Sequence, residues 1–303
     1  MIYYQQGLDD DEVIERTNVT IKMANAAGES AQTVSDQMTA VWNNFAKGGE
    51  NLEYYADVMT ALGAATASST SEISEGLEKF ASVAETVGLS YEYATSALAT
   101  VTATTRQSAD VVGTAFKTLF ARIQDLELGK TLDDGTTLGQ YSKALESVGV
   151  NIKDANGEIK DMDVILEEMA AKWQTLAKDQ QVSLAQSVAG VRQYTQLIAL
   201  MNNWDFMQEN LETAYNSTGT LTEQAEIYAE SWEAASKRVK ASAEGLYQSL
   251  LDDDFFIDIN NGFANMLTGL DAFIDGAGGL KTVIVGISSI IISNFANKIP
   301  EAI

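Results

Sequence analysis

The feature that most constrains the fold of this chain is a weak internal repeat, with a spacing of 39 residues, over roughly its first 125 positions. A repeat of this length fits two short helices joined by a turn. Each helical hairpin of this kind must stack on a neighbour to bury its apolar stripe, which is how scaffolds and spacers are built. The register is defined by six apolar columns: Val13, Leu52 and Tyr91; Val19, Val58 and Ala97; Met23, Leu62 and Val101; Val34, Ile73 and Val112; Met38, Leu77 and Phe116; Val41, Phe80 and Leu119.

A polar break divides each repeat, at Ser30, Ser69 and Ser108. After each break the apolar residues are spaced four and three apart, as on one face of a helix. The simplest interpretation of such a stripe is a packed core rather than a cofactor-binding surface. We therefore expect a helical-hairpin repeat region over residues 1–128.

The composition removes the commonest catalytic and metal-binding side chains. The 303 residues include no His and no Cys. Without His the chain lacks the usual general base and zinc ligand, and without Cys it lacks thiolate nucleophiles and disulfides. Carboxylate, Lys and Ser chemistry is left open. We expect no catalytic, cofactor-binding or metal-binding residues and no cofactor, and we predict that the protein is not an enzyme.

Charge and helix propensity limit the partners and the fold class. A single Pro, Pro300, and many Ala, Leu, Glu, Gln and Lys residues favour long uninterrupted helices. The formal net charge of −24, from 43 acidic and 19 basic residues, repels phosphate backbones and anionic membrane surfaces. Nucleic-acid binding by charge is therefore not expected. Residues 1–7 lack the charged and apolar regions of a secretory signal.

Turn-forming residues concentrate in residues 128–138, which make the best domain boundary in the chain. We expect residues 129–218 to form a helical core domain. Within it, alternating apolar residues around an Asn-Gly pair predict a small β-hairpin at residues 150–160. A helix is predicted to follow at residues 163–177, with Asp163 as its N-cap. A second helix is predicted at residues 183–202.

The last part of the chain changes its pattern twice. From Leu221 to Ser249, apolar and small residues alternate spacings of four and three, which predicts a long heptad-patterned helix over residues 219–251 that suits a coiled partner. Residues 252–303 are expected to form C-terminal helices. Their apolar segment, residues 282–292, is too short to span a bilayer, so it is interpreted as a buried helix, with a membrane-active segment as the alternative.

The predicted fold class is therefore mainly α: helical hairpins are followed by a small β-hairpin and long helices, with a coiled-coil-like segment.

Short motifs that resemble binding sites have simpler structural explanations. Residues 276–282 lack the last Gly that a P-loop places before its Lys. A calcium loop with Gly157 at its sixth position would begin at Ile152, where a carboxylate is needed. We therefore interpret residues 154–157 as a turn. The acidic runs at residues 9–12 and 252–254 are interpreted as solvated, the first also favouring the start of the next helix. The basic cluster at residues 237–240 is interpreted as ion pairing.

Several segments occur together in a specific order. They are YYQQGL at residues 3–8, AFKTLFAR at 115–122, a valine strand, DANG turn and glycine-glutamate strand at 145–160, DVILEEMA at 163–170, and AGVRQ at 189–193. With these segments, the run at residues 138–203 resembles the core region of phage tail tape measure proteins of the lactococcal siphophage type. The likeness covers residues 1 to about 250, and its order is more specific than any single segment.

The resemblance implies a structural protein in the tail of a long-tailed phage. Such a protein lies in the lumen of the tail tube, determines tail length during assembly and is released at DNA ejection. The resemblance also implies several copies per tail, tail tube, tail tip and assembly chaperone proteins as partners, and membrane contact through residues 282–292. The expected location is the virion tail, assembled in the bacterial cytoplasm, with a prophage gene as one source. Family members are usually much longer, so the chain is expected to be part of such a protein.

Two other classes of function remain open from the sequence. A secreted helical pore-forming or toxin-like protein would use residues 282–292 to enter membranes and would release dye from liposomes. A muralytic enzyme would need two carboxylates converging in a cleft and would clear cell walls. The repeat and the heptad pattern favour a non-enzymatic component that self-associates.

Overall fold

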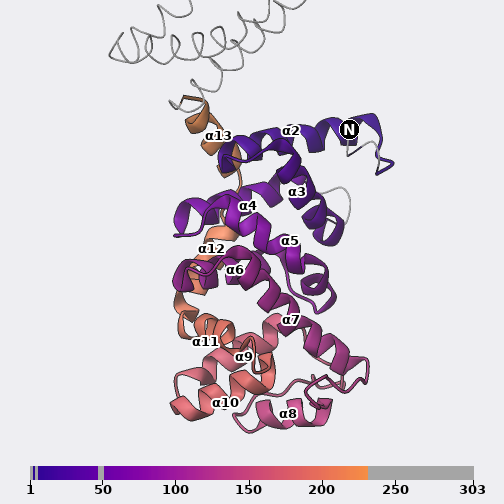
Figure 1. Cartoon of the computed structure of the whole chain (residues 1–303), viewed down its shortest axis with the longest axis vertical. Helices are drawn as coiled ribbons and strands as arrows, with labels where there is room; N and C mark the ends of the chain where they lie inside the picture. Colours follow the sequence, from indigo (N-terminus) through magenta and orange to yellow (C-terminus); the bar gives the residue numbers. More distant parts are fainter. Residues whose placement is uncertain (1–2, 4–5, 47–50, 231–303) are drawn as a thin grey trace, which may run out of the picture. The chain divides into compact units, whose positions relative to one another are not determined.

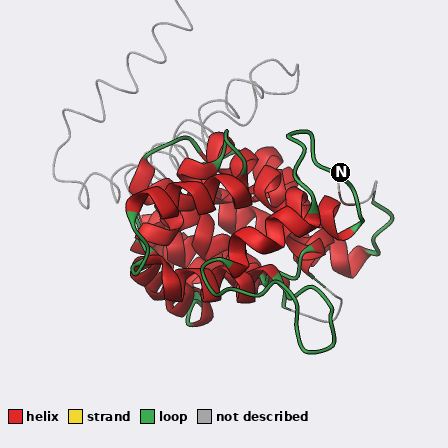
Figure 2. Ribbon diagram, turned by 90° about the horizontal axis from the view of Figure 1, so that it is seen from below, coloured by secondary structure: helices red, strands yellow, loops and turns green. Residues whose placement is uncertain are grey.

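The computed structural model describes residues 3, 6–46 and 51–230, and within them the chain is helical with no strand (Figure 2). These residues all belong to one compact unit, Met1–Ala234. The described helices are α2 (Asp10–Ala27), α3 (Ala31–Phe45), α4 (Leu52–Ala65), α5 (Thr70–Thr86), α6 (Tyr91–Thr105), α7 (Ala109–Glu127), α8 (Leu138–Glu146), α9 (Met162–Trp173), α10 (Lys178–Ala189), α11 (Tyr194–Asn202), α12 (Trp204–Tyr215) and α13 (Thr220–Glu230).

The first six described helices form three consecutive hairpins, α2–α3, α4–α5 and α6–α7 (Figure 1). The three serines of the polar break are the N-cap residues of α3, α5 and α7, and the side chains of Ser30 and Ser69 accept backbone hydrogen bonds there. Every residue of the six apolar columns is buried except Leu52, which is half-buried. The repeat register thus marks both helix starts and core positions.

Apart from α8, α9 and α10, the described helices lie in three layers. The middle layer is α2, α4 and α6, and α3, α5 and α7 pack on it (Figure 1). After α7 the chain turns through α8, α9 and α10, and then α11, α12 and α13 run back along the stack. On this return α11 contacts α6, α12 contacts α6 and α4, and α13 contacts α4 and α2. Because both outer layers cover α6, its residues 93–102 are all buried, and its Ala-, Thr- and Ser-rich sequence suits a helix without a solvent face.

Glycines allow α5 and α7 to approach each other closely. A Cβ atom at Gly113 would lie 2.4 Å from the carbonyl oxygen of Gly76, and a Cβ atom at Gly76 would lie 3.2 Å from the carbonyl oxygen of Ala109 at the start of α7. Nearby, the rings of Phe80 and Phe116 pack edge to face with their centroids 5.5 Å apart. In a close-packed interior, a larger residue at position 113 would push the two helices apart.

The predicted helix at residues 163–177 has different ends in the structure. It is α9, whose N-cap position is Asp161 rather than Asp163, and it ends at Trp173. Its start is set by a tertiary contact, because the N–H of Met162 donates to the carbonyl oxygen of Val87 at the end of α5. A contact between distant segments of this kind leaves no local signal in the sequence.

The helix predicted at residues 183–202 is two helices, α10 and α11. Gly190 separates them and adopts a φ of +78°, a conformation that disfavours other residues and ends the helix. As a result, Val191, which we expected in the apolar stripe, is 69% exposed. The prediction of one continuous helix was wrong because the apolar spacing continues across the break.

The predicted β-hairpin at residues 150–160 is not formed as two strands. Residues 153 and 159 make one isolated antiparallel bridge. The carboxylate of Asp154 accepts hydrogen bonds from the N–H groups of Asn156 and Glu158. These backbone N–H groups are therefore not available for hydrogen bonds between two longer strands. Ile152 is buried and anchors this turn to the helices, as a short hairpin requires.

Other predictions lie partly or wholly outside the described residues. Within the seam predicted for residues 219–251, Leu221 is buried and Ala225 and Tyr228 are half-buried, and the rest of the seam is not described. Residues 252–303, including residues 282–292, also lie outside the described part. The boundaries predicted after residues 128 and 218 stay predictions. None of the described helices has the length and hydropathy that crossing a lipid bilayer requires.

Candidate functional site: an acidic, tyrosine-lined groove and the Arg122 junction

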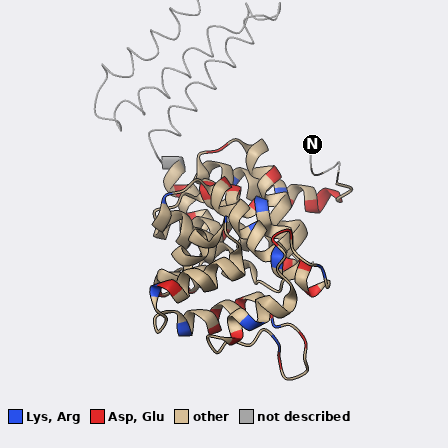
Figure 3. Ribbon diagram, turned by 60° about the horizontal axis from the view of Figure 1, so that its bottom comes forward, with Lys and Arg blue, Asp and Glu red and all other residues tan. Residues whose placement is uncertain are grey.

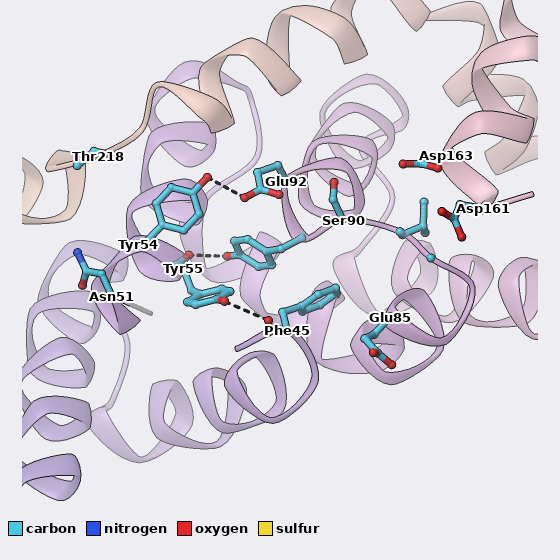
Figure 4. A pocket seen from close by; sticks show the side chains of 13 residues that line it. Phe45, Asn51, Tyr54, Tyr55, Glu85, Ser90, Glu92, Asp161, Asp163 and Thr218 are labelled. Atoms are coloured by element: carbon cyan, nitrogen blue, oxygen red, sulfur yellow. Dashed lines mark hydrogen bonds between the residues drawn. The ribbon is translucent and has the colours of Figure 1, made fainter. Parts of the chain in front are cut away.

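A groove of about 830 Å³ lies where the ends of α3, α4, α5, α6 and α9 meet (Figure 4). Two kinds of side chain dominate its wall, aromatic rings and carboxylates, and none of the described residues that line it is Lys or Arg. The lining residues are Phe45, Asn51, Tyr54, Tyr55, Glu85, Gly88, Leu89, Ser90, Tyr91, Glu92, Asp161, Asp163 and Thr218.

The tyrosine hydroxyls of the groove are engaged with the protein. Tyr54 donates to the Glu92 carboxylate at 2.7 Å, Tyr91 donates to the carbonyl oxygen of Tyr55, and Tyr55 donates to the carbonyl oxygen of Phe45 at 3.1 Å (Figure 4). Burial, and then the bond to Glu92, raise the pKa of Tyr54, so its hydroxyl keeps its proton and remains a donor. This wall is a rigid hydrogen-bonded surface rather than a set of free nucleophiles.

The carboxylates of the groove come from helix ends. Glu92 lies in the first turn of α6, Asp161 and Asp163 lie at the start of α9, and Glu85 lies in the last turn of α5. Acidic groups are favourable near helix N-termini, which gives Glu92, Asp161 and Asp163 a structural role. Burial also raises the pKa of Asp163. The groove therefore presents an acidic, hydrogen-bond-accepting surface beside aromatic rings.

The sequence patterns predicted no site residues and gave no indication of this groove. Glu92 and Asp163 belong to segments far apart in the chain, and only the folding of α9 against the end of α5 brings them together. The sequence does contain an acidic residue near the start of each of these two helices. It does not show that the two helix starts lie side by side. In the described residues, no group of three or more acidic side chains is arranged to hold a metal ion.

The acidic run at residues 9–12 forms the start of α2, where Asp9 and Glu12 make a reciprocal capping box. Figure 3 shows acidic positions, coloured red on the ribbon, in several of the described helices, and the whole chain has 43 acidic and 19 basic residues. The motifs at residues 237–240, 252–254 and 276–282 lie outside the described residues.

Arg122 joins the repeat region to the later helices. Its Nε donates to the carbonyl oxygen of Val188 at 3.2 Å, in the last turn of α10, where the helix dipole favours a cation. Its Nη1 donates to the Asp134 carboxylate at 2.8 Å. Hydrogen bonds from Thr136, and then from Arg122, lower the pKa of Asp134 to about 2 against its partial burial. The guanidinium is thus held between a helix end and a loop.

Replacing Arg122 with alanine is expected to lower the free energy of unfolding by about 2 kcal/mol, because charge-assisted hydrogen bonds at a mostly buried site are lost. Urea denaturation at pH 7 measures the change. The matched control is Arg192→Ala, which removes the same charge from an exposed position and should shift stability by less than about 0.5 kcal/mol. Equal effects of the two variants would contradict the structural role.

The same junction gives an expected pH dependence. The pKa of Asp134 is lowered in the folded state, so its contribution to stability is present above about pH 4 and is lost as the pH falls toward 2. The stability difference between the wild type and Asp134→Asn should therefore shrink over that interval. A difference that stays constant from pH 6 to pH 2 would show that the carboxylate charge at this position does not matter.

Comparison with known proteins gives one family. A family model described as phage-related minor tail protein matches residues 2–190, which is well over half of the chain. The matched region includes the three hairpins, the groove except for Thr218, and both sides of the Arg122 junction. No solved structure matches the chain.

Proposed function

Because this chain belongs to the phage-related minor tail protein family, we propose that it is a tape measure protein, or part of one, which determines tail length during assembly and is released at DNA ejection. The family match carries the assignment to a phage tail. The narrower role rests on the ordered segments that resemble tape measure proteins, and on the way those segments are used in the fold.

One contact of the fold supports the narrower role. The segment at residues 115–122 ends in Arg122, and this side chain binds the end of α10 beside the segment at residues 189–193. Two segments that carry the resemblance thus meet at one junction. The net charge of −24 also suits a protein that shares a tail lumen with DNA without binding it.

The partners and location follow as part of the proposal. Copies of the chain associate with one another and with tail tube, tail tip and assembly chaperone proteins, and the assembled protein resides in the virion tail. Assembly takes place in the bacterial cytoplasm, from a phage or prophage gene. Membrane contact at ejection is assigned to residues 282–292. The protein acts as a structural component and not as an enzyme.

Disruption of this gene in its phage is expected to abolish tails or to leave tails of variable length, because a length-setting component is missing. Electron microscopy of negatively stained lysates measures the length distribution. A plasmid copy of the wild-type gene should restore a single length, and mass spectrometry of purified particles should find the chain. Tails of normal, uniform length in particles that lack the chain would contradict the proposal.

A secreted helical pore-forming or toxin-like protein is the alternative. Purified full-length chain would then release dye from liposomes, and our proposal predicts no release from neutral vesicles in the absence of other tail proteins. A muralytic activity is tested separately by clearing of cell walls. If clearing occurred and were lost in Glu92→Gln, which keeps the size of a groove side chain, the non-enzymatic assignment would be wrong.

A further inference from the structure

One side of α2 is exposed in a way that the matching sides of α4 and α6 are not. Ile14, Asn18 and Ile21 are spaced four and three residues apart, so they lie on one face of the helix. Ile14 is 57% exposed, Ile21 is 50% exposed, and Asn18 is exposed between them. We call these three residues the open face of α2. Two large apolar side chains on one face make a patch rather than an isolated exposed residue.

The 39-residue repeat shows what happens to the same face in the second hairpin. The equivalent positions in α4 are Glu53, Asp57 and Thr60. Glu53 accepts hydrogen bonds from Lys22 on α2 at 2.7 Å and from Thr222 on α13 at 2.8 Å. Asp57 accepts hydrogen bonds from two backbone N–H groups at the start of α13, and Thr60 is 2% exposed. Neighbouring helices therefore cover this face of α4.

The third hairpin repeats the observation. The equivalent positions in α6 are Glu92, Ser96 and Ala99. Glu92 accepts a hydrogen bond from the hydroxyl of Tyr54 on α4 at 2.7 Å. Ser96 and Ala99 are fully buried, and the carbonyl oxygen of Ala99 accepts from the hydroxyl of Ser68, in the second hairpin, at 3.2 Å. Of the three hairpins, the first alone leaves this helix face open.

Other sides of α2 already have neighbours within the chain. Val13, Val19 and Met23 are buried in the core. On one flank the hydroxyls of Thr20 and Tyr3 share a hydrogen bond of 2.6 Å, and on the opposite flank Lys22 pairs with Glu53. The helix α13 also contacts α2, yet Ile14 and Ile21 stay exposed beside it. The open face thus points away from the core and from both flanks.

The open face is uncharged on a strongly acidic chain. Thr17 and Asn25, which share the same side of α2, are neutral as well. Two copies of a chain with a net charge of −24 repel one another, and contact through a neutral face keeps carboxylates from facing each other. The centres of protein interfaces are generally depleted of charged residues in this way. The charge pattern therefore favours a second copy over a basic partner at this face.

We propose that the open face of α2 binds the same face of a second copy of this chain. The face is symmetric about Asn18, so in an antiparallel pair Ile14 of each copy lies against Ile21 of the other, around a two-fold axis. An amide both donates and accepts hydrogen bonds, so Asn18 pairs with itself at that axis. The carboxylates at the equivalent positions of α4 would repel their own copies.

The pairing is weak and reversible, because two isoleucines per copy bury much less than the roughly 1,200 Å² of the smallest stable interfaces. It supplies the surface for the self-association proposed above, and its role in a tail rests on that proposed function. Its test uses the purified chain alone. A failure of pairing and a failure of tail-length control are therefore separate results.

Thiol cross-linking of the full-length chain tests the pairing. The chain has no Cys, so a bis-maleimide can join only two copies through one introduced thiol each. Asn18→Cys keeps both isoleucine contacts and places its thiol at the two-fold axis. The control is Val111→Cys, at a position of α7 that is 46% exposed. Linked dimer should form at least about tenfold faster at position 18 than at position 111, because pairing raises the local thiol concentration. A denaturing gel measures both rates.

A charge exchange tests the antiparallel arrangement. In the Asn18→Cys chain, Ile14→Lys or Ile21→Glu should each slow linking by about tenfold, since a charge would then meet an isoleucine of the other copy. Both changes in one chain should restore most of the rate, because each introduced ammonium then meets an introduced carboxylate across the pair. Both positions are exposed, so circular dichroism should show an unchanged fold.

Three results would overturn the proposal. Equal linking at positions 18 and 111 would mean that copies meet without using the open face. A rate at position 18 that neither single charge alters would mean the same, and a combined variant as slow as the single ones would exclude the antiparallel pair. If a later segment of the same chain covered the open face instead, Asn18→Cys would give no linked dimer at any protein concentration.

Discussion

Replacing Phe116 with alanine is expected to lower the free energy of unfolding by about 3–5 kcal/mol, the usual cost of removing a buried aromatic side chain. Phe116 is 1% exposed and lies in the repeat column with Met38 and Leu77. Its ring packs against Phe80 and Phe120 with centroid distances of 5.5 and 5.6 Å, so two aromatic contacts are lost with it. Chemical denaturation of the purified chain, followed by far-ultraviolet circular dichroism, measures the loss.

A neighbouring position on the same helix supplies the control. Val111 is 46% exposed on α7, and Val111→Ala should change stability by less than about 0.5 kcal/mol. Similar losses for Phe116→Ala and Val111→Ala would mean that the repeat columns do not form the core. The pair also links fold to function, because only the Phe116 variant should impair complementation of a phage that lacks the gene.

Gly113→Ala is expected to destabilise the chain by about 3 kcal/mol, although alanine is a better helix former than glycine. The added Cβ atom would meet the carbonyl oxygen of Gly76 at 2.4 Å, and relief requires α5 and α7 to move apart along their whole contact. The thermal midpoint and the urea midpoint should both fall. A midpoint equal to or above that of the wild type would show that the helices are not in such close contact.

The opposite outcome is expected for the same substitution on another helix. A Cβ atom at Gly139, near the start of α8, would meet nothing within 4 Å. Gly139→Ala should therefore stabilise the chain by about 0.5–1 kcal/mol, through helix propensity and a less flexible unfolded state. Both substitutions add the same methyl group to a helical glycine, and only the one at position 113 meets the backbone of another helix, so opposite signs would support the close contact of α5 and α7.

The hairpin layers of the fold could be predicted because their signals are local. The apolar columns and the serines that start α3, α5 and α7 repeat within a short stretch of chain, and each marks a feature of the helix that carries it. The return layer has no such repeat. Asn210 on α12 donates to the hydroxyl of Thr100 on α6, and both of these polar side chains are buried. Only the contact between distant segments explains them.

The groove and the capping of α13 by Asp57 were not predicted from the sequence, for a related reason. Glu92 and Asp163 each have a sufficient local explanation as residues near a helix start, so nothing in the pattern indicates that they share a cavity. Asp57 has no local role as a cap, since it lies inside α4 and acts on a helix far along the chain. The periodicity of a sequence indicates which face of a helix is buried, but it does not identify the helix that packs against that face.

The return of α13 to the side of α2 has a mechanical consequence. Because the chain enters and leaves this unit at the same end of the stack, tension between its two ends loads the α2–α13 contact first and peels helices one after another instead of shearing them together. While packed, the unit adds little to the end-to-end distance of the polypeptide. Once unravelled, each residue contributes up to about 3.3–3.6 Å, so the unit stores a large reserve of contour length.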